Sequence, residues 1–386
     1  MGKVISSNNK SITNEYPHKK ILYLDTGSIT CGKLESYQEI NIEKAPSRAK
    51  RLVQEHDIIY STVRPIQRHY GYIINPPENL VVSTGFSVIT TNRNLADPIF
   101  IYNLLSSKDI VETLDTIAEG STSAYPSLRP SDIENLDILL PPLAEQRVIA
   151  SVLSSLDDKI DLLHRQNKTL EAMAETLFRQ WFVEKPDGEW EEKTLDEVIT
   201  IKGGTTPSTK QSEFWDGDIY WTSPRDLSNH DSIFLFETER KITEKGLAEI
   251  SSGLLPIGTV LLSSRAPIGY LAITDIRVAI NQGYIAIICD KSVSNMFIYL
   301  WCKFNMKDIE NAGNGSVFQE ISKSSFKGLG IQIPPINIMR DFDKAVLPIF
   351  EKIRTNQKQK RTLEKLRDKL LPKLMSGDIR VRLQNT

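Results

Sequence analysis

The sequence predicts an α+β protein in which two similar mixed α+β domains are separated by two long helices that form an antiparallel coiled coil with pseudo-two-fold symmetry. Three observations predict this fold class. One helical stretch carries a sustained apolar repeat, a related stretch follows at a constant offset, and short strand-like runs precede each of them. A chain of 386 residues can form two or three domains, and the repeat indicates two similar halves.

The first long helix is predicted at residues 143–183. Its apolar residues recur at alternating spacings of four and three, which is the a/d seam of a coiled coil, and the stretch contains no Gly or Pro. Because Pro141 and Pro142 close the preceding segment, we expect one unbroken helix of about 41 residues and roughly 60 Å. The seam positions are Ile149, Leu153, Leu156, Ile160, Leu163, Asn167, Leu170, Ala174, Leu177 and Trp181.

The second long helix is predicted from a repeat at an offset of 193 residues. A second Pro-Pro pair at residues 334–335 repeats the first, and residues 360–364 repeat residues 167–171 without a gap. Pro348 is expected to kink this helix or to delay its start. The seam positions include Phe342, Val346, Ile349, Ile353, Asn356, Leu363, Leu370 and Leu374.

The two helices are expected to pair with each other in antiparallel directions, since a whole domain separates them along the chain. The predicted opposite pairs are Trp181 with Phe342, Leu153 with Leu370, and Asn167 with Asn356. A buried Asn pair fixes coiled-coil register at some cost in stability. Residues 143–183 hold five Lys/Arg and six Asp/Glu, whereas residues 336–375 hold eleven and five, so the charges are complementary. The alternative is two amphipathic helices that each pack only on their own domain.

The predicted domain boundaries follow from these helices. The segments are a first domain at residues 1–140, the central helix at 141–184, a second domain at 185–333, the C-terminal helix at 334–376 and a tail at 377–386.

Each domain contains runs of β-branched and aromatic residues that are broken by Gly and Pro and followed by a helix, which indicates mixed α+β structure. The strand-like runs of the first domain are KKILYLDTGSI, DIIYSTVRP, YGYII and NLVVSTGFSVIT, and its helix is predicted at residues 98–114. In the second domain TLDEVITI comes first, a loop follows at residues 203–210, and GTVLLSSRAPIGYLAI and VAINQGYIAIIC precede a helix at residues 296–312. Aligning Arg64 with Arg265 relates the two domains.

Composition indicates a cytoplasmic protein without a membrane span. No apolar run approaches the roughly 18 residues that cross a bilayer, and residues 1–16 lack the apolar core of a signal peptide. The formal net charge of −2 does not by itself indicate nucleic-acid binding, but a local basic face can bind phosphate beneath a balanced total. Cys31, Cys289 and Cys302 lack the spacing of a disulfide framework or a zinc site, and we expect them in the core.

Several long motifs resemble the DNA-specificity subunit of type I restriction-modification systems. PPLAEQRVIASVLSSLDDKID and NKTLEAMAETLFRQWF are similar to the central region of that family, and SSRAPIGYLAI with NQG is typical of its target-recognition domains. The resemblance covers nearly the whole chain. One departure is that the first domain lacks the opening W-x-x-x-x-L-x-x-V that Trp190, Leu195 and Val198 supply in the second domain.

The resemblance implies a protein that reads double-stranded DNA at a split target, with one domain for each half-site and the helix pair as spacer and docking scaffold. Its implied partners are two modification subunits, which carry S-adenosylmethionine and methylate adenine, and a motor and nuclease subunit that uses ATP and magnesium. This chain is then expected to be no enzyme, to hold no cofactor or metal, and to contact no membrane.

Residue patterns that could carry catalysis in this chain are weak. Residues 75–78, NPPE, resemble an adenine-methyltransferase motif but lack its aromatic residue, so we interpret them as a turn. Gly203 and Gly204 with Lys210 do not match a P-loop, and residues 239–241, with Asp226 and Asp231 upstream, match a nuclease triplet that arises freely in a highly charged chain. The alternative functions are a stand-alone methyltransferase or nuclease with its own recognition domains, and a coiled-coil scaffold that does not bind DNA.

Candidate DNA contacts in the first domain surround a predicted turn. Arg64 and Arg68 flank Pro65 after a strand, and arginine can either grip guanine through two hydrogen bonds or clamp phosphate. The structural alternative is an arginine that only caps the turn. The candidates are Lys50, Arg51, Arg64, Arg68 and Tyr70, together with Ser121 and Tyr125 near the junction with the long helix.

Candidate contacts in the second domain lie in a Gly-rich loop and a stretch of aromatic and basic residues. Asn281 and Gln282 supply amides that suit adenine, and Arg265 is interpreted as the equivalent of Arg64. The structural alternative is a solvated loop over a core tryptophan. The candidates are Lys202, Thr205, Thr206, Lys210, Trp221, Arg225, Arg265, Asn281, Gln282 and Ser316.

Overall fold

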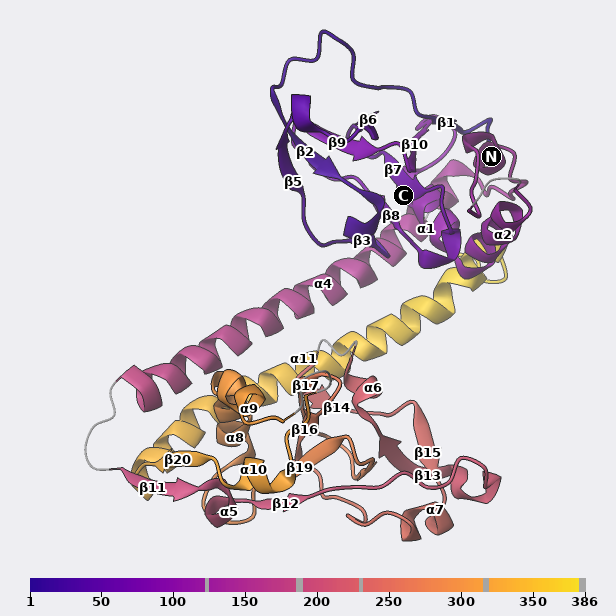
Figure 1. Ribbon diagram of the computed structural model, residues 1–386. Helices are drawn as coiled ribbons and strands as arrows, with labels where there is room; N and C mark the ends of the chain where they lie inside the picture. The colour runs from indigo at the N-terminus through magenta and orange to yellow at the C-terminus, as the bar shows by residue number, and fades with distance from the viewer. Residues whose placement is uncertain (122–124, 185–189, 229–231, 315–318, 382–386) are drawn as a thin grey trace. The chain divides into compact units, whose positions relative to one another are not determined.

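The computed structural model describes residues 1–121, 125–184, 190–228, 232–314 and 319–381 (Figure 1). The chain divides into two compact units, Met1–Ile160 with Thr362–Thr386, and Asp161–Arg361. Each unit therefore combines one globular domain with a stretch of each long helix. Within the described residues, no helix has the length and apolar character needed to span a membrane.

The first domain is built on two packed sheets. Its strands are β1 (Ile5–Ser7), β2 (Lys20–Leu24), β3 (Ile29–Thr30), β4 (Lys33–Leu34), β5 (Gln38–Asn41), β6 (Ala49–Leu52), β7 (Ile58–Ser61), β8 (Tyr70–Tyr72), β9 (Leu80–Ser83) and β10 (Phe86–Thr91). Its helices are α1 (Pro98–Ser106), α2 (Lys108–Glu119) and α3 (Pro130–Glu134), with short 3-10 turns at Thr26–Ser28, Ile42–Lys44 and η3 (Pro65–Gln67). The sheets have the orders β1-β10-β7-β8 and β5-β2-β9-β6, and β3 pairs with β4.

The core of the first unit lies on both faces of the sheet β1-β10-β7-β8. On one face, Ile58 and Ile89 pack against Phe100 of α1 and Leu114 of α2. On the other face, Ile59 packs with residues of the second sheet in a separate cluster. Alternation along each strand sends neighbouring side chains to opposite faces, which is why adjacent apolar residues of β7 serve two cores.

The second domain follows the same plan. Its strands are β11 (Glu191–Thr194), β12 (Thr200–Lys202), β13 (Trp215–Thr222), β14 (Phe234–Leu235), β15 (Arg240–Ile242), β16 (Val260–Ser264), β17 (Ile268–Thr274), β18 (Ala279–Ile280), β19 (Tyr284–Ile288) and β20 (Gly330–Ile333). Its helices are α5 (Leu195–Val198), α6 (Pro224–Leu227), α7 (Glu244–Ala248), α8 (Asn295–Phe304), α9 (Met306–Asn311) and α10 (Lys323–Lys327), with a 3-10 turn at Ser212–Phe214. The sheets have the orders β12-β19-β16-β17-β14 and β15-β13-β18, and β11 pairs with β20.

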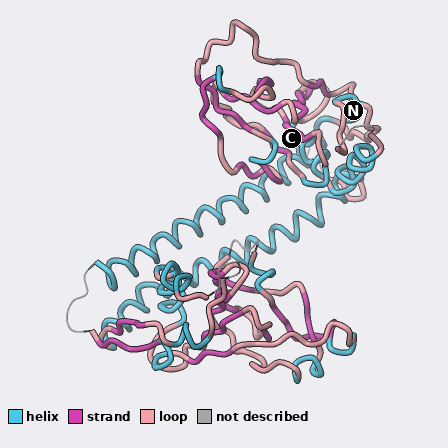
Figure 2. Tube along the Cα trace, in the orientation of Figure 1, coloured by secondary structure: helices cyan, strands magenta, loops and turns pink. Residues whose placement is uncertain are grey.

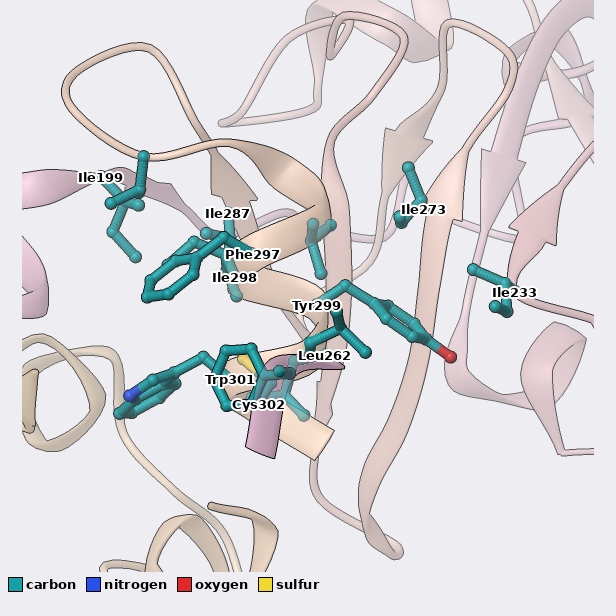
Figure 3. Packing of buried hydrophobic residues seen from close by; sticks show 14 of the residues in the cluster. Ile199, Ile233, Leu262, Ile273, Ile287, Phe297, Ile298, Tyr299, Trp301 and Cys302 are labelled. Atoms are coloured by element: carbon teal, nitrogen blue, oxygen red, sulfur yellow. The ribbon is translucent and has the colours of Figure 1, made fainter. Parts of the chain in front are cut away.

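Helix α8 covers one face of the five-stranded sheet. Figure 3 shows Phe297 and Ile298 of this helix close to Ile287 of β19 and Leu262 of β16, all buried in one cluster. Ser294 caps the helix by accepting a hydrogen bond from the Phe297 backbone N–H at 3.1 Å. Burial of side chains of this size stabilises the domain by about 1.5–3 kcal/mol each.

The predicted helices at residues 98–114 and 296–312 are each two helices. Ser107 has an extended backbone, with φ −63° and ψ 147°, and separates α1 from α2. Asn305 leaves the helical region between α8 and α9. A Ser or Asn side chain can bond to nearby backbone, so these residues favour such breaks, but an apolar pattern that continues across the break conceals them.

The two domains share one backbone frame, which corrects the alignment of Arg64 with Arg265. The carbonyl of Thr62 accepts from the Leu128 N–H at 2.7 Å, and the carbonyl of Ser264 accepts from the Ile321 N–H at 3.0 Å. Thr62 is therefore the counterpart of Ser264, which makes Val63 the counterpart of Arg265.

The residue that follows confirms this correction. Arg64 and Ala266 both precede proline and both have positive φ, 46° and 54°. Val63 and Arg265, one position earlier, each form an isolated bridge with the segment that precedes α3 or α10. The alignment of Arg64 with Arg265, which was based on residue type, is therefore shifted by one position from the alignment that the backbone geometry gives.

The same frame corrects the interpretation of the N-terminal segment. Ser7 of β1 pairs with Ile89 of β10, as Ile201 of β12 pairs with Ile287 of β19. Met1 N donates to the Leu136 carbonyl at 2.6 Å, as Leu195 N donates to Leu329. Met1 and Val4 therefore hold the positions of Leu195 and Val198, so this part of the opening is present, and only the interpretation of residues 11–29 as its replacement was wrong.

The long helices are α4 (Leu143–Arg179), of 37 residues and followed by a π-helical turn at Gln180–Glu184, and α11 (Ile336–Ser376), of 41 residues. Figure 2 shows both as continuous helices. The expectation that Pro348 delays the second helix is wrong, because α11 begins well before it. Proline has no N–H to donate to the carbonyl four residues earlier, and both Pro348 and Lys344 are exposed, where water can replace such a bond.

Antiparallel pairing of α4 and α11 is confirmed inside each unit. In the second unit, Asn356 Nδ2 donates to Asn167 Oδ1 at 3.0 Å, and the rings of Trp181 and Phe342 are 5.8 Å apart. A later residue of α4 thus meets an earlier residue of α11, which defines opposite directions.

The first unit shows the same direction. Leu153 of α4 lies in one core cluster with Leu374 of α11, and Leu370 packs against that cluster. Every predicted seam residue of both helices is buried or half-buried. The coiled-coil prediction from the spacing of four and three is therefore confirmed.

Candidate nucleic-acid interface

The loop after β7 gathers several candidates of the first domain. Arg64 and Arg68 flank η3 and are both exposed, and both have positive φ. The Arg64 guanidinium lies 5.8 Å from the centre of the Tyr125 ring, and the Arg64 N–H donates to the Pro126 carbonyl at 3.1 Å. Ser121 Oγ accepts from the Ser127 N–H at 3.3 Å. Two exposed arginines and an aromatic ring on a fixed turn suit contact with phosphate or base edges.

Lys50 and Arg51 lie on β6, beside the segment that follows β1. The Lys50 carbonyl accepts from the Ile12 N–H at 2.8 Å, and Ser11 forms a bridge with Arg51. Lys50 is exposed, whereas Arg51 is half-buried, and burial lowers the pKa of its guanidinium.

The turn at residues 83–85 joins this strand to the Arg64 loop. Thr84 N donates to the Arg48 carbonyl, and the Gly85 carbonyl accepts from Thr62 N, both at 2.8 Å. The turn at residues 83–85 is thus bonded both to the residue that precedes β6 and to the segment that leads to Arg64.

Tyr70 is a core residue, which corrects its assignment as a DNA contact. Its exposed fraction is 6%, and its ring stacks on Tyr60 with centroids 5.6 Å apart. Its hydroxyl donates to the Ser106 carbonyl at 3.4 Å, and burial raises the pKa of that hydroxyl. The side chain lies on the face of the sheet that α1 covers and is not available to a ligand.

Five candidates of the second domain lie in or beside the loop at residues 203–210. Lys202 Nζ donates to the Ser252 carbonyl at 3.4 Å, and Thr205 Oγ1 donates to the Glu249 carbonyl at 2.7 Å. Thr206 Oγ1 donates to Gln282 Oε1 at 2.7 Å. The loop also holds Lys210, which is exposed.

Gly204 is required for the close approach of this loop to the sheet. A Cβ at this position would lie 1.8 Å from the Ile280 carbonyl oxygen. Only glycine allows the two backbones to come this close, and the contact holds the loop beside the turn at residues 281–283.

Trp221 is a buried residue that packs beneath the loop at residues 203–210 and does not form part of an exposed surface. Its exposed fraction is 6%, and it packs edge-to-face on Trp215 with centroids 5.1 Å apart. Its Nε1 donates to the Thr205 carbonyl at 3.4 Å, and Trp215 Nε1 donates to the Ser208 carbonyl at 3.1 Å. The loop over a core tryptophan, which was the structural alternative, is the observed arrangement.

Two basic residues of the triplet at 239–241, which the sequence analysis did not assign to DNA contact, lie over aromatic rings of this domain. The Arg240 guanidinium lies 3.4 Å from the centre of the Trp215 ring, and Lys241 Nζ lies 4.8 Å from the centre of the Tyr220 ring. Both come from β15, which pairs with β13. The sequence shows two adjacent basic residues in one strand-like run and aromatic residues in another. Their contact could not be predicted, because it depends on the pairing of the two strands.

The remaining candidates have structural partners. Arg225 is exposed, and its Nε lies 3.7 Å from a Glu239 carboxylate oxygen. Asp226 accepts from the backbone N–H groups of Ser223 and Glu239 at 2.9 and 2.8 Å, so it caps a turn. Arg265 is half-buried and lies 3.5 Å from Glu320. The suspected nuclease triplet therefore has a role in local structure.

Asn281 and Ser83 hold the same turn in the two domains. Asn281 Oδ1 accepts from Gly283 N at 2.9 Å, and Ser83 Oγ accepts from Gly85 N at 3.1 Å. The central residues of the two turns are Gln282, which is exposed, and Thr84, which is half-buried. One backbone turn thus presents an amide in one domain and a hydroxyl in the other.

Two sequence candidates lie outside the described residues, namely Ser316 and the possible metal ligand Asp231. Within the described part of the chain, no group of three or more His, Cys, Asp or Glu side chains could hold a metal ion. Cys302 is buried and Cys289 half-buried, but Cys31 is exposed, which corrects its expected place in the core.

Duplicated α+β domains with polar loops, each followed by a long helix, define a class of paired recognition proteins. The chain belongs to the family described as type I restriction modification DNA specificity domain, which matches residues 1–172 and 187–366. It is 27% identical over 443 residues to the type I restriction enzyme HindI specificity subunit of Haemophilus influenzae, and 95% of each chain is covered.

Two further comparisons agree with membership in this family. The chain is 37% identical over 194 residues to the type I restriction enzyme MjaIX specificity subunit of Methanocaldococcus jannaschii, covering 50% of this chain and 45% of that protein. Among solved structures, the S subunit of a type I restriction-modification system from M. genitalium has a TM-score of 0.62 at 17% identity and covers 97% of this chain and 94% of that one. The likeness to the solved structure concerns the fold.

Proposed function

We propose that this chain is the DNA-specificity subunit of a type I restriction-modification complex and that it reads a split target with one domain on each half-site. The observation that carries this proposal is one backbone frame that presents different side chains in the two domains. Arg64 occupies the position of Ala266, and Thr84 occupies the position of Gln282. Equivalent positions with different hydrogen-bonding groups suit two different base sequences.

The paired helices act as the spacer between the half-sites. Helix α4 has 37 residues, which at 1.5 Å per residue corresponds to about 55 Å. One turn of B-DNA measures roughly 34–36 Å, so a rod of this length suits half-sites more than one turn apart. The gap in the target is then a property of the helices, and the bases are a property of the loops.

Catalysis belongs to partner subunits in this proposal. The helix pair is a docking scaffold for two modification subunits, which bind S-adenosylmethionine, and a motor and nuclease subunit supplies ATP-driven cleavage with magnesium. The residues of this chain bind and orient the DNA and carry out no bond-breaking step. Titration of the purified chain with S-adenosylmethionine is expected to give no saturable binding, and saturable binding would favour a stand-alone methyltransferase.

The proposal is tested by mapping methylated adenines in DNA from cells that express this chain with its modification subunits. We expect methylation at a target with two specific segments separated by a gap of fixed length. A single contiguous target, or methylation at the same sites without this chain, would contradict the proposal.

Salt dependence separates this function from that of a scaffold that does not bind DNA. Several phosphate contacts release several counterions, so the logarithm of affinity for duplex DNA is expected to fall linearly with the logarithm of salt concentration. Fluorescence anisotropy of the assembled complex on a labelled duplex measures this slope. A complex without measurable DNA affinity at low salt would favour the scaffold.

A further inference from the structure

The second domain carries an edge strand that the first domain lacks within the described residues. Strand β14 pairs in parallel with β17, with Phe234 opposite Ile273, and extends the sheet to five strands. The corresponding sheet of the first domain ends at β8. The segment that contains β14 lies against α11.

A nearly buried carboxylate joins this edge of the sheet to the helix. Asp275 follows β17, and its side chain is only 7% exposed. One carboxylate oxygen lies 2.5 Å from an Arg354 guanidinium nitrogen, and the other lies 2.7 Å from Lys358 Nζ. The two cations are four residues apart on α11 and therefore face the same side of the helix. A buried carboxylate needs such partners, because desolvation without them is costly.

The segment after β14 continues this contact along the helix. The Phe236 ring lies beneath Lys358 Nζ, at 5.5 Å, and beneath the Arg361 guanidinium, at 5.2 Å. The same guanidinium lies 2.5 Å from a Glu237 carboxylate oxygen. We name the set Asp275, Phe236, Glu237, Arg354, Lys358 and Arg361 the helix latch.

The first domain has no such carboxylate at the equivalent position. Strand register makes Tyr72 the counterpart of Ile273, so Ile74 is the counterpart of Asp275, and it is 65% exposed. On α4, the counterparts of Arg354 and Lys358 are Asp161 and Arg165, which pair with each other at 2.9 Å. At these equivalent positions, the first domain therefore does not form the contact that Asp275 makes in the second domain.

We propose that the helix latch holds the second domain in one orientation on α11 and thereby sets the gap that the complex selects, with Asp275 as a positioning residue. This inference rests on the proposed function. One added base pair moves a half-site by about 3.4 Å and rotates it by roughly one-tenth of a turn. A domain that can turn on its helix accepts neighbouring gaps, whereas a latched domain rejects them.

The test uses Asp275→Asn in the assembled complex with its modification subunits. Affinity is measured on duplexes that carry both mapped half-sites and differ only in gap length by single base pairs. We expect the preference for the best gap over its neighbours to fall by roughly fivefold to tenfold, as for the loss of one strongly coupled contact. The half-site sequences in the methylation map are expected to remain unchanged.

Two further variants separate positioning from folding. Asp341→Asn removes an exposed ion pair with Lys344 on the same helix, at 3.0 Å, and is expected to leave gap preference unchanged. Glu237→Gln weakens the ion pair with Arg361. Because the Glu237 side chain is 51% exposed, this variant is expected to relax gap preference by a smaller factor than Asp275→Asn.

Gap selection equal to wild type in folded Asp275→Asn and Glu237→Gln complexes would overturn the inference. A wild-type complex without any gap preference would instead contradict the proposed function. The two failures are therefore distinguishable in one set of measurements.

Discussion

Arg64 holds a backbone conformation that residues with a Cβ seldom adopt. Its φ of 46° places the Cβ near the following carbonyl, at a cost of about 1–2 kcal/mol. Ala266 also has a positive φ at the equivalent position, so this feature of the backbone is common to both domains. The arginine side chain is specific to the first domain, and a long exposed cation on a rigid turn is suited to contact with DNA.

Replacing this side chain tests its role. We expect Arg64→Ala to reduce affinity for duplexes that contain the first half-site by about tenfold, since a good arginine contact to a base is worth about 1–3 kcal/mol. Alanine can adopt the positive φ that this position requires, since Ala266 at the equivalent position has a φ of 54°. Electrophoretic mobility shifts on duplexes with one half-site scrambled at a time measure the effect.

The control is Arg93→Ala. Arg93 is also exposed, but it follows the C-terminal end of β10. Phe86, at the N-terminal end of β10, pairs with Ser61 in the strand that leads to Arg64. No change in affinity is expected. Equal losses on both half-sites for Arg64→Ala would contradict the division of the target between the domains.

Residue chemistry could be predicted from the sequence only where local pattern decided it. The Asn167 and Asn356 pair followed from the repeat register, because the coiled-coil period fixes which residues meet. The burial of Tyr70 was missed and that of Trp221 was only one of two alternatives, because strand alternation does not tell which face a helix or loop will cover.

At the scale of the helices, polar residues interrupt the apolar seam at defined places. Asn356 Nδ2 donates to Asn167 Oδ1 in a layer where both residues are buried. Such a layer lowers stability relative to leucine but rejects other registers, because a shifted helix leaves both amides unpaired.

A pair of variants measures this layer. Asn356→Leu is expected to lower the thermal unfolding midpoint, because it leaves the Asn167 amide buried without its partner, at a cost of about 1–3 kcal/mol. The double variant Asn167→Leu with Asn356→Leu is expected to unfold at or above the wild-type temperature. Differential scanning calorimetry makes the comparison, and a double variant less stable than the single one would refute the assigned role.

A second polar contact in the seam is expected to matter less. Arg367 donates to Asp157 Oδ1 at 2.9 Å, with side chains 34% and 43% exposed. Solvent screens such a pair, so a double-mutant cycle of Arg367→Ala and Asp157→Ala is expected to give a coupling energy of at most about 1 kcal/mol. Urea unfolding provides the values. A coupling above about 2 kcal/mol would show that this pair contributes as much as a buried one.

Helix register was the part of the fold best predicted from sequence, since a repeat without gaps must keep the same seam. The N-terminal strand β1 was missed, because its three residues, Ile5–Ser7, carry no local strand signal and are recognised only by pairing with β10. Strand β14 has two residues and was missed for the same reason, although Phe236 and Asp275 beside it contact α11.

At the scale of the molecule, the proposed function separates two properties of the target. The bases depend on loops such as residues 203–210 and the Arg64 turn, and the gap depends on α4, α11 and the helix latch. The sequence predicted the duplication and the helix pair. The residues that read bases were not predictable to the same degree, because loop side chains acquire their directions from tertiary contacts such as those of Gly204 and Trp215.

The most direct test of this account lengthens both helices together. Duplicating residues 154–160 in α4 and residues 363–369 in α11 adds one heptad to each helix around the Asp157 and Arg367 contact and keeps the seam. Seven residues add about 10.5 Å, which corresponds to roughly three base pairs. Methylation mapping of the complex is expected to show unchanged half-sites and a gap about three base pairs longer. An unchanged gap with intact methylation would contradict the spacer role of the helices.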